Sequence, residues 1–139
     1  MTNRLTFALI GALATQACFA QSMPYVSWLI DPGESSSAKI EVWPAPTPIK
    51  NYVWRLLSSD GVILAEMPQP DIPSGYTVNY GECNIDGVLR HNVIAIVRHT
   101  EKREWSKDVL SMWLANAEAK SFAKGSTHQA TCRNERYGV

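Results

Sequence analysis

Apolar and polar residues alternate over much of the chain, and this two-residue period is the feature that most restricts its fold. In the stretch SAKIEVWP, the apolar residues Ala38, Ile40 and Val42 are separated by charged ones. Successive side chains of a β-strand point to opposite faces, so this pattern is typical of a strand with one buried face. We expect Pro44 to end this strand, because proline cannot donate to a strand ladder.

Similar patterns, separated by turn-forming residues, predict further strands. The stretch NYVWRLLSSDGVILAEMP predicts a hairpin with Asp60-Gly61 in its turn, since this dipeptide favours tight turns. The chain is therefore expected to form one mainly-β domain over residues 21–139, a small sandwich or half-open barrel of six to eight strands with one disulfide. Strands are expected at 25–30, 52–57 and 62–67, in GYTVNYGEC and in HNVIAIVRH.

The segment WSKDVLSMWLANAEAKSFAK, residues 105–124, fits two structures. A helix over about 106–124 would begin at Ser106 and end before Gly125, and would make the domain α+β. The other structure is a hairpin with strands 109–115 and 121–124, joined through NAEAK. In the hairpin, Val109 would share a face with Trp113, and Met112 would take the other face. We favour the hairpin, because the helical apolar stripe fades in the second half of the segment.

The first twenty residues, MTNRLTFALIGALATQACFA, have the layout of a secretory signal peptide. A basic residue precedes a short apolar run, and small residues lead to Ala20. The run is too short to span a membrane as a helix, which needs about 20 apolar residues. Thr15-Gln16-Ala17 fits a lipoprotein signal poorly, so lipid anchoring at Cys18 is not expected. We expect a protein that is periplasmic or secreted, with no transmembrane segment.

The charge of the chain is balanced, with 13 basic and 13 acidic residues. Removal of the signal peptide takes away one basic residue and leaves a net charge of −1. A chain of this charge has no electrostatic basis for binding nucleic acid. We therefore expect no nucleic-acid partner.

Cleavage of the signal peptide would leave two cysteines, Cys83 and Cys132. An even pair in an exported chain is most simply a disulfide, because exported proteins mature in oxidising compartments. The alternatives are a metal pair, which would need further ligands at short spacing, and a cysteine nucleophile. We predict a Cys83–Cys132 disulfide that joins the middle of the chain to its C-terminal end.

The stretch ECNIDG places oxygen-bearing side chains at alternate positions, as the start of a calcium loop does. Glu82, Asn84 and Asp86 are therefore weak calcium candidates. Arg90 and Val93 stand where such a loop needs its later ligands, including the closing glutamate. An ordinary turn, with Gly87 at positive φ, is the simpler interpretation.

Two of the five tryptophans are candidates for contact with a partner. Trp43 lies beside the proline-rich stretch PAPTP, and Trp105 lies inside the charged cluster RHTEKREWSKD. Tryptophan is enriched at interface hot spots, although most tryptophans in a domain of this size pack in the core.

The C-terminal half resembles small uncharacterised exported proteins of Gram-negative bacteria. The resemblance covers residues 80–139 and depends on a tryptophan-bearing strand, a short turn, a phenylalanine and the ending C-x-N-E-x-Y-G-V. It implies a shared domain and an envelope location, and no activity.

No serine stands in a G-x-S-x-G motif and no glycine in a phosphate-binding loop. We expect a non-enzymatic exported binding protein without a cofactor, of the inhibitor or immunity type, with a protein partner in the cell envelope. The alternatives are a small cell-wall-acting hydrolase, whose carboxylates would come from separate strands, and a structural or weakly calcium-supported envelope module.

Overall fold

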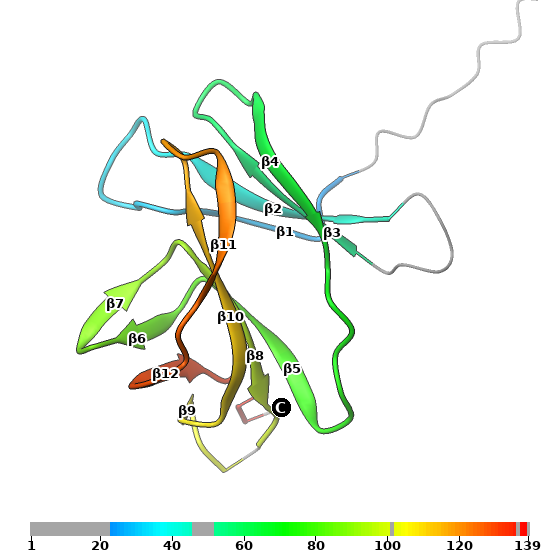
Figure 1. Ribbon diagram of the computed structural model, residues 1–139, viewed down its shortest axis with the longest axis vertical. Coiled ribbons are helices and arrows are strands. Elements are labelled where there is room, and N and C mark those ends of the chain that lie inside the picture. Colours follow the sequence, from blue (N-terminus) through cyan, green and yellow to red (C-terminus); the bar gives the residue numbers. More distant parts are fainter. Residues whose placement is uncertain (1–22, 46–51, 101, 136, 139) are drawn as a thin grey trace, which may run out of the picture.

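Twelve strands and no helix make up the part of the chain that the computed structural model describes, residues 23–45, 52–100, 102–135 and 137–138. The expected signal peptide and Cys18 lie outside these residues. The strands form three antiparallel sheets of four strands each (Figure 1). The mainly-β fold with one disulfide is therefore confirmed, and the helical alternative over 106–124 is wrong.

The first sheet has the strand order β1-β2-β3-β4, and its strands follow one another along the chain. Its hairpin between β3 and β4 confirms the predicted turn, in which Gly61 has a φ of 84°. Strand β2 ends at Pro44 as predicted, and Pro44 pairs with Tyr52 as the last residue of the strand. The bounds are β1 Val26–Leu29, β2 Lys39–Pro44, β3 Tyr52–Leu57 and β4 Ile63–Pro68.

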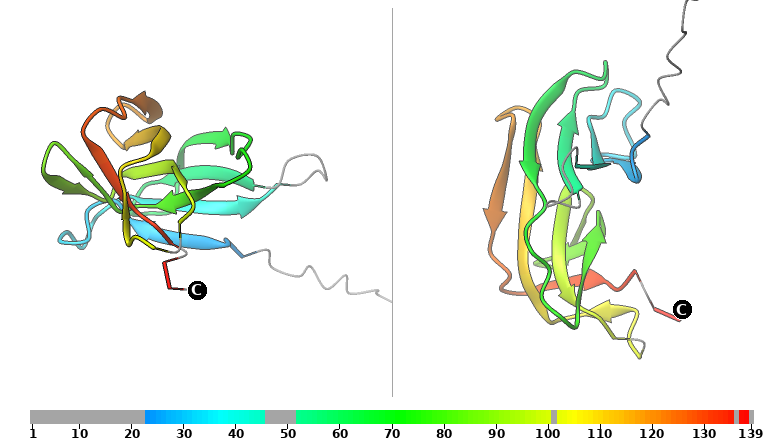
Figure 2. Two further views of the ribbon diagram at one scale, coloured as in Figure 1. Left: turned by 90° about the horizontal axis from the view of Figure 1, so that it is seen from below. Right: turned by 90° about the vertical axis from the view of Figure 1, so that its right-hand side faces the viewer.

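The second sheet has the order β11-β10-β8-β5 and lies between the other two. Its central strands β8 and β10 run along the molecule between the first and third sheets (Figure 1). In two further views these strands curve along the length of the molecule, and β12 crosses them near the end that holds the C-terminus (Figure 2). The bounds are β5 Tyr76–Tyr80, β8 Val93–Arg98, β10 Val109–Asn116 and β11 Ser121–Gly125.

The third sheet has the order β7-β6-β12-β9 and is built from very short strands. They raise the strand number above the expected six to eight, because strands of two to four residues are too short to show a period of two. The bounds are β6 Cys83–Ile85, β7 Val88–Arg90, β9 Trp105–Ser106 and β12 Ala130–Arg133.

Strand β8 explains why VIAIV is an unbroken apolar run. Val93, Ala95 and Val97 face the third sheet, whereas Ile94 packs in the cluster shared with the first sheet. All five residues are at most 1% exposed, because the second sheet is covered on both faces. A strand buried on both faces loses the polar half of the alternating pattern.

A β-bulge in β10 corrects the predicted arrangement of its side chains. Val109 pairs with Val97 but Ser111 pairs with Ile96, so Leu110 is the extra residue. The bulge changes the parity of the strand, and Val109 consequently packs with Met112 instead of sharing a face with Trp113. Leu110 is turned outward and is 47% exposed.

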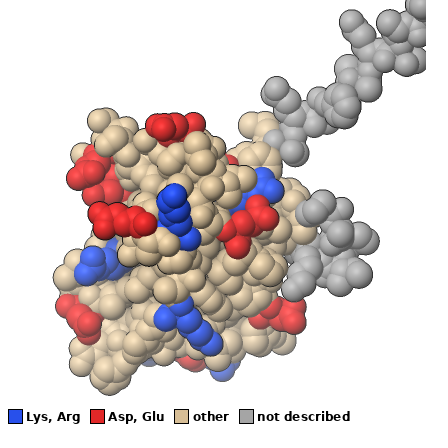
Figure 3. All heavy atoms as spheres, turned by 45° about the horizontal axis from the view of Figure 1, so that its top comes forward, with Lys and Arg blue, Asp and Glu red and all other residues tan. Residues whose placement is uncertain are grey.

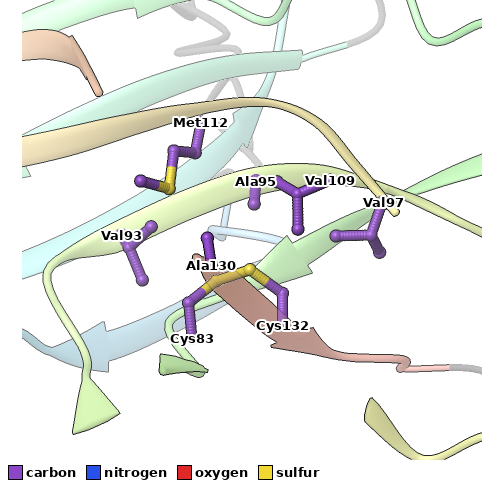
Figure 4. Packing of buried hydrophobic residues seen from close by; sticks show 8 residues of the cluster. All are labelled: Cys83, Val93, Ala95, Val97, Val109, Met112, Ala130 and Cys132. Carbon is purple, nitrogen blue, oxygen red and sulfur yellow. A yellow bond between two sulfur atoms is a disulfide. The ribbon is translucent and has the colours of Figure 1, made fainter. Parts of the chain in front are cut away.

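Two hydrophobic cores hold the three sheets together. Between the first and second sheets, the fully buried Trp54 packs edge-on against Trp113, with ring centroids 5.3 Å apart. Between the second and third sheets, Val93, Met112 and their neighbours pack against the Cys83–Cys132 disulfide (Figure 4). The disulfide confirms the predicted pairing and lies where Cys83 and Cys132 are directly opposite each other on β6 and β12.

Candidate functional site

Trp43 lies on the outer face of the first sheet, half-buried among charged side chains. Its indole Nε1 donates a hydrogen bond of 2.7 Å to Glu41, and the guanidinium of Arg55 lies 5.1 Å from its ring centroid. Glu41 also forms an ion pair of 2.6 Å with Lys39. The outer-face contacts of Trp43 are thus made with charged neighbours of its own sheet.

Trp105 lies in β9, on the third sheet, and is also half-buried. The structure therefore places the two candidate tryptophans on different sheets and does not bring them together. A shallow hollow near β9 is lined by Lys102, Arg103 and Lys107. Arg98 at the same hollow is paired with Asp108 at 2.7 Å.

The stretch ECNIDG forms the β6–β7 hairpin. Asp86 and Gly87 occupy its turn with φ values of 51° and 80°, as a tight two-residue turn requires. The Glu82 carboxylate accepts a hydrogen bond of 2.8 Å from Arg133, and Asn84 pairs with Thr131 within the third sheet. Among the described residues, no group of three or more His, Cys, Asp or Glu side chains could hold a metal ion.

The third sheet positions the chain after β12. The buried Asn79 of β5 donates a hydrogen bond of 2.7 Å from its Nδ2 to the Arg133 carbonyl, and its Oδ1 accepts one of 3.2 Å from the Glu82 amide. Asn134, 2% exposed, bonds through its side chain to the carbonyls of Thr100 and Arg103. These contacts bring Glu135 alongside β5.

Three tyrosines meet at one end of the sandwich formed by the first and second sheets. Tyr25 precedes β1, Tyr52 begins β3 and Tyr80 ends β5. The ring of Tyr25 lies 5.3 Å from that of Tyr52 and 6.3 Å from that of Tyr80, measured between centroids. Tyr25 therefore bridges the two sheets, and its own side chain remains 63% exposed.

These rings line a hollow of about 340 Å³, which we call the tyrosine pocket. This volume falls in the range of small-ligand pockets, which starts at roughly 300 Å³. No hydrogen bond to the three tyrosine hydroxyls is formed within the described part of the chain, so all three can bind a ligand. The remaining lining residues are Gln69, Ile72, Thr77, Val78 and Glu135.

Partial burial raises the pKa of two groups in the tyrosine pocket. Desolvation raises the pKa of Tyr80 to about 12, with smaller contributions from Tyr25, Tyr52 and Glu135. Desolvation also raises the pKa of Glu135 above its ordinary value of 4.5, and the neighbouring Glu82 adds to the rise. The Tyr80 amide, which donates to Glu135 at 3.4 Å, and the Arg133 guanidinium lower it by less.

The tyrosine pocket is not among the sites predicted from the sequence. Its residues come from five separate segments, and only the strand pairing and the disulfide-anchored tail bring them together. One signal was present, because Tyr25, Tyr52 and Tyr80 each stand at an end of an alternating stretch. A tyrosine there can offer its ring to the end of a sheet rather than to the core.

Comparisons with protein-family models, curated proteins and solved structures return no match for this chain. The Cys83–Cys132 disulfide supports an oxidising, extracytoplasmic compartment. The described residues contain no helix with the length and apolar character that a membrane crossing needs. On the face shown in Figure 3, acidic and basic side chains are interspersed.

Proposed function

We propose that this chain is an exported, non-enzymatic binding protein that holds a protein partner in the cell envelope at the tyrosine pocket. The observation that carries the proposal is the meeting of Tyr25, Tyr52 and Tyr80 around a hollow with unbonded hydroxyls. Tyrosine is enriched at binding surfaces because its ring offers apolar area while its hydroxyl offers a hydrogen bond.

The setting of the tyrosine pocket supports the same proposal. The rings belong to strand ends of two sheets that are packed together through a large core, so little order has to be gained on binding. Ile72, 37% exposed, adds an apolar rim. The proposal includes the inhibitor or immunity type of function, in which a small rigid protein covers part of another protein.

A comparison of two arginine variants tests the proposal. Ile72→Arg places a bulky side chain at the rim of the tyrosine pocket, whereas Val62→Arg makes the same kind of change at the exposed β3–β4 turn. Wild-type protein and both variants are immobilised and exposed to envelope extract of the host cell. We expect at least one protein to be retained by wild type and Val62→Arg and lost with Ile72→Arg. Retention of the same proteins by all three would contradict the proposal.

A further inference from the structure

The tyrosine pocket carries negative charge. Glu135 is the one charged residue among the described residues that line it. Among the described residues, Arg133 is the cation that acts on Glu135, and it is already paired, since it lies 2.8 Å from a Glu82 oxygen and 3.9 Å from a Glu104 oxygen. Among the described residues, three carboxylates act on this one guanidinium, and Glu135 is the one of them that lines the tyrosine pocket.

The Glu135 carboxylate has capacity for further hydrogen bonds. An ionised carboxylate offers about four acceptor sites. Within the described residues, the carboxylate of Glu135 receives one hydrogen bond, the long one from the Tyr80 amide. A ligand that brings N–H donors and positive charge would therefore meet both needs of this group.

The rings add a second attraction for a cation. Tyr25 and Tyr52 are tilted by 42° to each other, and Tyr80 stands edge-on to Tyr25, so the three rings form a corner rather than a flat stack. The face of an aromatic ring attracts a cation within about 6 Å of its centroid. Such a corner can hold an alkyl chain against the rings and present its charged end to Glu135.

We propose that the tyrosine pocket binds the side-chain cation of a lysine or arginine of the partner protein, with Glu135 as counter-ion and the rings of Tyr25 and Tyr52 around the alkyl stem. This inference rests on the proposed function and adds to it the chemistry of the partner. An anionic ligand would be repelled by Glu135, and a neutral one would leave its charge uncompensated.

The pH dependence follows from the groups that face Glu135. These are Glu82 and Arg133 beside it and the phenols of Tyr25, Tyr52 and Tyr80. Burial raises the pKa of Glu135, and a bound cation would lower it again. Cation binding should therefore weaken as the pH falls through the pKa of Glu135, with no such step in Glu135→Gln.

The test uses n-butylammonium as the probe and n-butanol as its neutral counterpart of similar shape. Binding is followed through the NMR signals of carbon-13-labelled tyrosine rings, assigned with Tyr25→Phe, Tyr52→Phe and Tyr80→Phe. We expect n-butylammonium to shift these ring signals saturably, with a millimolar Kd, and n-butanol to shift them at least several-fold more weakly.

Matched variants separate the contribution of the Glu135 charge to binding from that of the Tyr25 ring. Glu135→Gln should weaken n-butylammonium binding roughly fivefold, while Glu118→Gln, the same change on the exposed β10–β11 turn, should leave it unchanged. Tyr25→Leu should weaken it about threefold, whereas Tyr25→Phe keeps the ring and should bind as wild type does. NMR contacts among the remaining tyrosine rings, measured for each variant without ligand, show that the variant folds.

Three results would overturn the inference: no saturable shift, equal binding of n-butanol, or equal loss in Glu135→Gln and Glu118→Gln. None of these results would contradict the proposed function, because Ile72→Arg and Val62→Arg test whether a partner is retained and not which charge the partner carries. If partner retention depends on position 72 but n-butylammonium does not bind, the chain is still a binding protein, and its partner is recognised by another chemistry.

Discussion

Gly81, a single residue, allows Trp28 of the first sheet to pack closely against the end of the second sheet. Its backbone has a φ of 82°, and a Cβ at this position would lie 2.3 Å from the indole nitrogen of Trp28. That nitrogen donates a hydrogen bond of 2.7 Å to the His91 carbonyl, and the Nδ1 of His91 lies 2.9 Å from the Gly81 carbonyl. Close approach of Trp28 therefore requires glycine here for two reasons, space and backbone conformation.

We expect Gly81→Ala to destabilise the protein by about 3 kcal/mol, from overpacking against Trp28 and a strained backbone. Gly87→Ala is the matched control, because Gly87 has a similar φ of 80° and open space where its Cβ would lie. It should cost only about 1 kcal/mol. Denaturant unfolding measures both values, and an equal loss in the two variants would show that the contact with Trp28 does not constrain position 81.

The raised pKa of Glu135 predicts a pH dependence of stability at the same scale. The folded protein binds the Glu135 proton more tightly than the unfolded chain does, so this group lowers the free energy of unfolding as the pH rises from about 4.5 through its folded pKa. Relative to Glu135→Gln, wild type should lose stability across this window. Unfolding measured at closely spaced pH values checks this, and parallel curves for the two proteins would disprove it.

At the level of a secondary-structure element, the bulge in β10 leads to a prediction about stability. Deletion of Leu110 would remove the extra residue and leave Val109 two positions before Met112, on the same face, so the pairs Val109–Val97 and Ser111–Ile96 would become consecutive. The free energy of unfolding should therefore change by less than about 1 kcal/mol, because no buried side chain changes its face. Leu110→Ser keeps the bulge at an exposed position and should change stability by less than about 0.5 kcal/mol. Denaturant unfolding measures both variants, and a loss of about 2 kcal/mol or more in the deletion variant would contradict the assignment of Leu110 as the extra residue.

The disulfide links β6 to β12 at a pair of directly opposite residues. It closes a loop of 49 residues and supplies two fully buried side chains to the core between the second and third sheets. Replacement of Cys83 and Cys132 by alanine together should lower the free energy of unfolding by about 4 kcal/mol in the chain-entropy model. Unfolding of the double variant beside the oxidised wild type measures this, and a loss below about 1 kcal/mol would mean that β12 stays docked without it.

At the scale of the whole molecule, local patterns predicted much of the first and second sheets. The hairpin of β3 and β4 was evident because each arm has six residues with a strand pattern on either side of the Asp60-Gly61 turn. The third sheet was missed because its strands are too short for periodicity, and the side-chain directions in β10 were wrong at the bulge. A bulge changes parity without leaving a pattern in the residues.

The tyrosine pocket could not be predicted from local patterns, since it depends on how distant segments meet. Tyr52 and Tyr80 belong to different sheets, and Glu135 reaches β5 only because Asn79 and the disulfide hold the tail. Trp43 and Trp105 could be named from composition, yet composition says nothing of the sheets on which they lie. The remaining candidate site therefore had to come from the fold.

The central claim is that the tyrosine pocket is the surface at which this chain meets its partner. The most direct measurement is photo-crosslinking in living host cells, with benzoylphenylalanine in place of Ile72 at the rim or of Val62 at the β3–β4 turn. We expect one discrete crosslinked protein from position 72 and none from position 62. The absence of any adduct from position 72, or the same adduct from both positions, would contradict it.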